Sequence, residues 1–179
     1  MPTLLAFAGS NSSTSINHQL VTYLTTQVKE TSFELFNLSD MDLIIYSEDE
    51  ERENGFPSSI KQIYKHIQAS KGLLISVNEH NSNPSAFFKN VLDWLSRLDR
   101  KFLEGKKIFL LSASTGARGA IGSQEVVHQL ILRFAGEVVD TYAFPSFKDN
   151  FSVENQQISN AEINQDILSK LAQFENQLK

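Results

Sequence analysis

The stretch TLLAFAGSNSSTS, residues 3–15, joins a short apolar run to a run of glycine, serine and threonine. The apolar part, residues 3–8, shows no polar alternation, which is typical of a strand buried on both faces of a parallel sheet. The part that follows is made of residues that form turns and cap helices. This stretch therefore predicts a buried strand that ends in a polar turn and leads directly into a helix.

The rest of the chain repeats this alternation of strand and helix. Period-two or continuous apolar runs predict four more strands, at residues 32–38, 72–77, 107–112 and 137–143. Apolar residues at helical spacing predict helices at residues 16–28, 58–69, 85–98, 120–135 and 161–178. Such alternation predicts a three-layer α/β sandwich, whose parallel sheet has helices on both faces. Because crossovers are right-handed, few topologies remain, and strand order 2-1-3-4-5 is a common one.

Composition limits the class of protein. The 179 residues fit a single domain, residues 1–179, and the absence of cysteine excludes disulfides, thiolate metal sites and a cysteine nucleophile. The net charge of −5 argues against a nucleic-acid partner, and no apolar run reaches the roughly 20 residues of a membrane span. We therefore expect a cytoplasmic protein. Two segments predict irregular structure, the acidic run at residues 47–54, expected to be a solvated loop, and the Phe-rich run at residues 144–151.

Three polar turns follow the first, third and fourth predicted strands. They lie at residues 9–17, 78–84 and 112–119. In open parallel sheets, ligands bind beyond the carboxyl ends of the strands, at the switch point between strands one and three. The three turns should therefore meet at one edge of the sheet and form the binding site.

The first turn has the composition of a phosphate site. A helix N-terminus presents free N–H groups and a partial positive charge, and neighbouring hydroxyls can complete the coordination of a phosphate. The turn contains neither G-x-x-x-x-G-K-[ST] nor G-x-G-x-x-G, so a P-loop and a dinucleotide fingerprint are both unsupported. The alternative is that its serines serve only as helix caps.

The second and third turns are suited to a flat ligand. Gly116 and Gly119 allow the backbone to approach a ligand closely, and Arg118 is the one positive charge in the three turns. Arg118 would then hold a phosphate of an incoming nicotinamide cofactor, or it is a solvated surface residue. His80 and Trp94 have plain alternatives as well, a surface histidine and a core tryptophan. The four histidines stand singly, so no metal site is expected.

Together the turns resemble the NADPH-dependent FMN reductase family, whose fold is flavodoxin-like. The family motif G-S-x-R-x-x-S-x-N is similar to residues 9–17, except that Ser12 stands in place of the arginine. The second motif resembles P-E-Y-N-G-S followed by L-K-N-x-x-D-W. The chain matches it at Glu79, Asn81, Lys89, Asn90, Asp93 and Trp94, and departs from it at Asn78 (for Pro), His80 (for Tyr) and Ser82 (for Gly).

The resemblance implies a site for FMN, with the chemistry carried by N5 of the flavin rather than by a catalytic side chain. The phosphate would be held by the first turn, at Gly9, Ser10, Ser12, Ser15, Ile16 and Asn17. The ring would lie against the second turn, at Glu79, His80, Asn81 and Ser82. The third turn would close over its other side, at Ser112, Ser114, Thr115, Gly116, Arg118 and Gly119.

It also implies an NAD(P)H oxidoreductase, with NADPH or NADH as donor, that works by a ping-pong hydride relay. The acceptor would be a quinone, an azo compound, a free flavin or an oxidised metal ion. A homodimer or homotetramer is expected, with Phe144, Phe147 and Phe151 either at its interface or covering the sheet edge. Two alternatives stay open: a flavodoxin-like electron carrier without a nicotinamide site, and a binding module that has lost flavin, which the missing arginine suggests.

Overall fold

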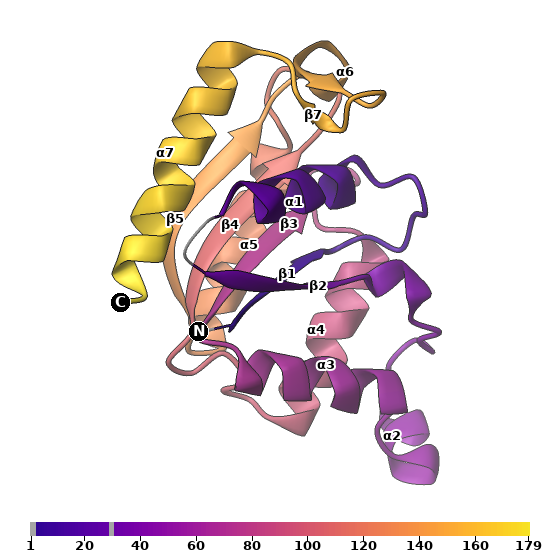
Figure 1. Ribbon diagram of the computed structural model, residues 1–179. Helices are drawn as coiled ribbons and strands as arrows, with labels where there is room; N and C mark the ends of the chain where they lie inside the picture. The colour runs from indigo at the N-terminus through magenta and orange to yellow at the C-terminus, as the bar shows by residue number, and fades with distance from the viewer. Residues whose placement is uncertain (1–2, 29–30) are drawn as a thin grey trace.

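The computed structural model describes residues 3–28 and 31–179 and contains one large parallel sheet. Its strands are β1 (Thr3–Ala8), β2 (Ser32–Phe36), β3 (Gly72–Val77), β4 (Lys107–Ala113) and β5 (Glu137–Phe144). They lie in the order β2-β1-β3-β4-β5, and every neighbouring pair is parallel. The predicted sheet order is therefore confirmed, and the carboxyl ends of β1, β3 and β4 lie side by side at one edge (Figure 1).

Helices cover both faces of this sheet. One face packs against α1 (Ile16–Gln27) and α7 (Ala161–Gln177), and the other against α3 (Ser58–Ala69), α4 (Ala86–Leu98) and α5 (Ile121–Arg133) (Figure 1). Strand side chains alternate between the faces, so Leu73 and Ile75 pack under α3 and α4 whereas Leu74 packs with α1 and α7. β3 is buried along its whole length, which explains its continuous apolar sequence.

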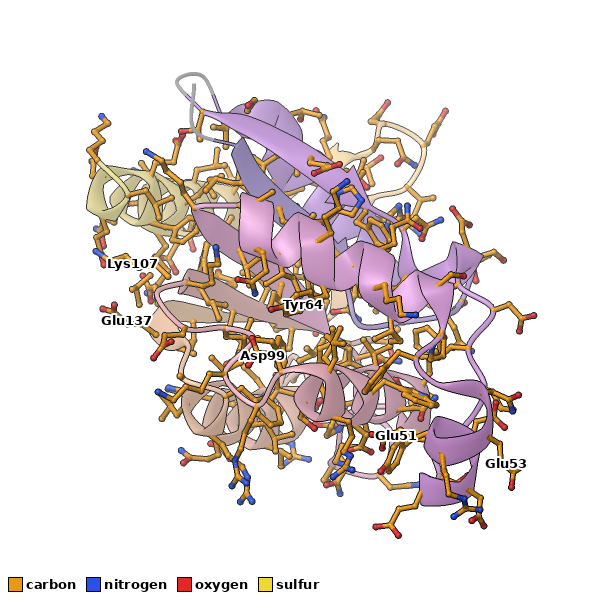
Figure 2. The ribbon with its side chains drawn as sticks, turned by 90° about the horizontal axis from the view of Figure 1, so that it is seen from below. Glu51, Glu53, Tyr64, Asp99, Lys107 and Glu137 are labelled. Carbon is orange, nitrogen blue, oxygen red and sulfur yellow. The ribbon has the colours of Figure 1, made fainter. Side chains whose placement is uncertain are left out.

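The segment between β2 and α3 differs from the prediction. β2 ends at Phe36, and residues Leu38–Asp40 form a 3₁₀ turn. The acidic run, predicted to be a loop, forms the helix α2 (Glu48–Asn54), which projects from the body of the protein (Figure 2). It has no buried residue, so its solvation was correctly expected. The helix forms because the Ser47 side chain caps its first turn and four carboxylates there favour the helix dipole.

The motif on α4 fixes the chain that precedes α2. Asn90 Nδ2 and Trp94 Nε1 both donate to the carbonyl oxygen of Ile44, at 2.9 and 3.0 Å, and Asn90 Oδ1 accepts from the Tyr46 N–H at 2.8 Å. Trp94 is fully buried, so the core alternative for this residue is correct. Lys89 and Asp93, one helical turn apart on α4, form an i, i+4 ion pair. The second half of the family motif therefore stabilises the fold.

Further contacts hold α2 and α3 in place. Arg97 Nε on α4 donates to Glu51 Oε2 at 2.9 Å, and the Tyr46 hydroxyl donates to the same oxygen at 3.0 Å. The guanidinium beside Glu51 lowers the pKa of that carboxyl below its usual value. On α3, the Tyr64 hydroxyl donates to Asp99 Oδ2 at 3.0 Å, just past the end of α4 (Figure 2).

The Phe-rich segment after β5 covers the sheet. It forms the short helix α6 (Phe147–Asn150) and a small hairpin of β6 (Phe151–Ser152) and β7 (Gln157–Ile158). Phe144, Phe147 and Phe151 are at most 3% exposed, and the last two rings stack with centroids 4.6 Å apart. Of the two alternatives for these rings, their burial in the core on the α1 and α7 face agrees with covering the sheet, because buried rings leave no surface for a contact with a second chain.

Candidate functional site

Asn17 joins the first polar turn to the third and to strand β3. This side chain lies in the first turn of α1 and is only 2% exposed. Its Nδ2 donates to the carbonyl oxygen of Ala113 at 3.2 Å, and its Oδ1 accepts from the Ala113 N–H at 2.9 Å and from Ser76 Oγ at 2.6 Å. The start of α1 is therefore tied to β3 and to the end of β4. The amide predicted to bind phosphate is thus engaged with the protein itself.

The serines of the first turn divide into buried and exposed positions. Ser15 is buried and caps α1, since its Oγ accepts from the His18 N–H at 3.2 Å. Ser10 is buried as well, and its Oγ accepts from the Ser12 N–H at 3.2 Å. Ser12 and Thr14 lie exposed, with their hydroxyl oxygens 3.3 Å apart. The capping alternative holds for Ser15. The exposed hydroxyls of this turn, which a ligand can reach, are those of Ser12, Ser13 and Thr14, and Ser12 Oγ also accepts from the Thr14 N–H at 3.3 Å.

Gly9 brings this turn against α4. A Cβ at Gly9 would lie 2.6 Å from the Phe88 ring, so only glycine permits this approach. The carbonyl oxygen of Gly9 also accepts from Ser85 Oγ, the capping residue of α4, at 3.2 Å. The chain therefore holds the N-termini of α1 and α4 close to one another at the same edge of the sheet.

The second turn is a tight hairpin turn. The N–H of His80 donates to the carbonyl of Asn83 at 2.8 Å, and the N–H of Asn83 to the carbonyl of His80 at 3.2 Å. Its central residues, Asn81 and Ser82, have φ of 54° and 61°, which is the type I′ geometry that Asn-Gly adopts most easily. Serine in this conformation costs about 1–2 kcal/mol relative to an ordinary backbone. The turn presents exposed backbone and side chains at the carboxyl edge of the sheet. This edge, formed by the three turns at residues 9–17, 78–84 and 112–119, is called the rim below.

The Glu79 carboxylate is hydrogen-bonded to the start of α5. Its Oε2 accepts from the Ser123 N–H at 3.1 Å, within the first turn of that helix, where a carboxylate is stabilised by the helix dipole. Ser123 in turn donates from Oγ to the carbonyl oxygen of Asn78 at 2.7 Å. These two bonds fix the second turn against α5, so Glu79 positions the site and is not placed as an acid or base.

The third turn is pinned at its base and open at its tip. Buried Ser112 donates from Oγ to the carbonyl oxygen of Gly119 at 2.7 Å, and Ser114 Oγ accepts from the Gly116 N–H at 3.3 Å. Gly119 has a φ of 59° and lies against the backbone of Ala143. Thr115, Gly116 and Arg118 are exposed at the rim. The tip is also held, since the Gly116 carbonyl oxygen accepts from the Ser146 N–H at 3.0 Å, but its side chains at Thr115 and Arg118 are exposed to a ligand.

The rim suits an anionic, flat ligand. The first helical turn of α1 contains no acidic residue. Exposed hydroxyls lie in the polar turn at residues 9–17, and Arg118 lies exposed in the polar turn at residues 112–119. The carboxylate of Glu79 is already bound to α5. Residues that sequence reasoning missed are Ser76, Ser85 and Ser123, whose hydroxyls hold the turns together. A serine inside the apolar run of β3 was the one signal available for Ser76.

Within residues 3–28 and 31–179, two other kinds of feature are absent. No three or more His, Asp or Glu side chains gather there as a metal centre would require. In the same described part of the chain, no helix combines the length and apolar character needed to cross a membrane.

The sheet order and the site at its carboxyl edge define a flavodoxin-like α/β protein. The sequence profile of the NADPH-dependent FMN reductase family matches residues 2–149, so the chain belongs to that family. The family predicted from the turn motifs is therefore confirmed, and its description names both FMN and NADPH.

Individual relatives agree with this placement. The chain is 31% identical over 91 residues to the quinone reductase of Escherichia coli (strain K12), which is 51% of this chain and 48% of that protein. The chain thus spans about half the length of this curated relative. The flavoenzyme NAD(P)H:(acceptor) oxidoreductase FerB from Paracoccus denitrificans superposes with a TM-score of 0.78 at 20% identity, covering 99% of this chain and 97% of FerB. An azoreductase from Bacillus anthracis gives 0.63 at 15% identity, over 99% and 100%. At these identities the structures support the fold alone.

Proposed function

We propose that this protein binds FMN at the rim and uses it to pass electrons from NAD(P)H to a small acceptor. The observation that carries this proposal is the hydrogen-bonded joining of the first and third turns through Asn17. It holds a helix N-terminus without acidic residues at the edge of the sheet where the type I′ turn also lies, in the family whose description is FMN reductase. A phosphate and an attached ring system are the groups that such an edge can accept together.

Each turn has a separate part in binding. The N–H groups at the start of α1 and the hydroxyl of Ser12 would hold the phosphate, while Ser15 and Asn17 keep that helix in place. The turn from His80 to Asn83 and the tip at residues 114–118 would contact the ring system, and Arg118 would hold a phosphate of the nicotinamide donor. Backbone N–H groups at the rim would stabilise negative charge on the reduced ring.

Bound FMN would supply the redox chemistry, taking two electrons with a proton from NAD(P)H and giving them to the acceptor. The protein then needs no acid or base of its own, which agrees with the engagement of Glu79 by α5. The nicotinamide and the acceptor would use the same exposed side of the rim in turn, a ping-pong sequence. The names of the relatives, a quinone reductase and an azoreductase, favour quinones and azo compounds as acceptors.

Reconstitution with FMN tests the proposal. Purified protein incubated with FMN and desalted should keep the visible absorbance of flavin, and it should then oxidise NADPH or NADH when menadione is present. Initial rates over both substrates should give the parallel double-reciprocal lines of a ping-pong mechanism. Retained flavin without NAD(P)H oxidation would favour the electron carrier, and protein without flavin would contradict the proposal.

Restoring the family's arginine tests the phosphate end of the site. The Ser12→Arg variant should bind FMN about tenfold to a hundredfold more tightly, because a charge-assisted hydrogen bond contributes about 1.5–3 kcal/mol. Fluorescence titration with FMN and with riboflavin, which lacks the phosphate, measures this effect. Equal gains for both ligands would contradict a phosphate contact at position 12. Ser13→Arg, one residue further along the same exposed turn, is the matched control for added charge.

The expected homodimer or homotetramer stays a prediction. The side chains of Phe144, Phe147 and Phe151 are buried within the chain and leave no surface for the contact. Ile121, Val126 and Leu132 of α5 are apolar side chains that are exposed in the single chain. Sedimentation of the reconstituted protein gives the number of chains directly.

A further inference from the structure

Asn78 occupies the centre of the rim. It directly follows β3, whose last residue, Val77, pairs with Ser112 of β4, so Asn78 comes beside Ala113. Ala113 is the residue to which Asn17 binds. Continuing the strand alternation from Ser76, which bonds to Asn17, places Asn78 on the same face of the sheet as the start of α1. Asn78 therefore lies between the first turn and the second.

The side chain of Asn78 carries an unsatisfied acceptor. Its Oδ1 is buried, and no donor among the described residues reaches it. The backbone carbonyl of the same residue is satisfied by Ser123 Oγ, so the deficit belongs to the side chain alone. An unpaired buried polar atom is costly and uncommon in folded proteins, and each one calls for an explanation. A proline, the residue usual here in the family, would carry no such atom.

A ligand can supply the missing donor. Asn78 as a whole is partly exposed, and the terminal torsion of asparagine is broad, so the amide can turn its oxygen toward the rim without backbone movement. An amide oxygen needs an N–H or O–H donor, which an ionised phosphate oxygen does not provide. The phosphate and the ring of FMN would lie at the two turns on either side. The polyol chain that connects them carries hydroxyl donors, and it would cross the edge of the sheet at Asn78.

We propose that the Asn78 amide oxygen accepts a hydrogen bond from a hydroxyl of the polyol chain of the bound flavin nucleotide. This inference rests on the proposed function and adds to it a residue in which the chain departs from its family motif. Asn78 would supply a neutral contact in a site that lacks the family's arginine. In the described conformation this oxygen has no donor, and a hydroxyl of the bound ligand would supply one.

Three ligands and one pair of variants test this contact. In Asn78→Ala, FMN and riboflavin should bind about three- to tenfold more weakly, the effect of one neutral hydrogen bond. Lumiflavin, which has the ring but no polyol chain, should bind as it does to the unchanged protein. The flavin-free variant should unfold about 2–4 °C higher, because the unpaired acceptor is gone. Thr22→Val removes another unpaired buried oxygen, on α1, and should raise stability without altering flavin affinity.

The outcomes separate this inference from the proposed function. If the unchanged protein binds no flavin, the proposed function fails and this contact with it. If the unchanged protein binds FMN and Asn78→Ala binds it equally well, only the contact is overturned. An equal loss for lumiflavin, or a lower unfolding temperature for the flavin-free variant, also overturns it, because Oδ1 then meets the ring or a group within the chain.

Discussion

Replacing Asn17 with leucine is expected to lower the free energy of unfolding by about 3–5 kcal/mol, the largest effect of any single change at the rim. Leucine fills a similar volume but leaves the N–H and the carbonyl of Ala113 and the hydroxyl of Ser76 without partners. Buried polar groups that lose their partners bear the full cost of desolvation. Urea denaturation of the flavin-free protein, followed by circular dichroism, measures the difference.

Ser76→Ala is the graded comparison for this variant. It removes one of the three hydrogen bonds and leaves Asn17 paired with Ala113, so a loss of about 1 kcal/mol is expected. Because Asn17→Leu also frees the start of α1 from β4, FMN affinity should fall by more than tenfold in that variant and far less in Ser76→Ala. Equal losses of stability in the two variants would show that the bonds to Ala113 contribute little.

Replacing Gly119 with alanine is expected to cost about 3 kcal/mol or more. The backbone there has a φ of 59°, a conformation that costs an L-residue about 1–2 kcal/mol. The added Cβ would also lie 2.7 Å from the carbonyl carbon of Ala143 and 2.9 Å from that of Phe144. These are backbone atoms that cannot rotate away, so β5 or the third turn must shift, which would stretch the bond from Ser112 to Gly119.

Gly116→Ala provides the matched control within the same turn. Its nearest neighbour, Ser114 Oγ, would lie 3.8 Å from the new Cβ, and its φ lies outside the left-handed region. A change within about 0.5 kcal/mol is therefore expected. Comparable destabilisation of both variants would indicate that loss of glycine flexibility, rather than the packing against β5, decides the outcome. Thermal unfolding of the flavin-free Gly119→Ala and Gly116→Ala proteins measures the two changes in stability.

The sequence predicted the sheet well because burial of a parallel strand leaves a continuous apolar run, and such runs are visible one by one. β3 and β4 were found in this way, and the polar turns that follow them had to share an edge. The acidic run was misjudged for a related reason. Its charge correctly indicated exposure, but Ser47 and Gly55 at its two ends are helix-capping residues, and their signal was outweighed by the charge.

The hydrogen-bond partners of the polar side chains could not be predicted from the sequence. Asn17 bonds to a residue 96 positions away, and Glu79 to one 44 positions away, so no local pattern reveals them. Sequence alone marks such residues as polar and near the site, but it does not distinguish a ligand contact from a bond within the protein. Ser15, Asn17, Glu79 and Ser112 all make bonds that hold the turns together, whereas Ser12, Thr115 and Arg118 are exposed to a ligand, with the Ser12 hydroxyl bonded to the neighbouring Thr14.

The first and third turns of the rim come from parts of the chain roughly a hundred residues apart, and the three turns meet only when β1, β3 and β4 lie side by side in the sheet. An unfolded chain therefore contains no fragment of the site able to retain a ligand. Whatever binds there selects the native state, and by mass action it adds RT ln(1 + [L]/Kd) to stability, about 2.7 kcal/mol at a hundredfold excess over Kd. The amount of free ligand in the cell would then govern how many copies escape proteolysis.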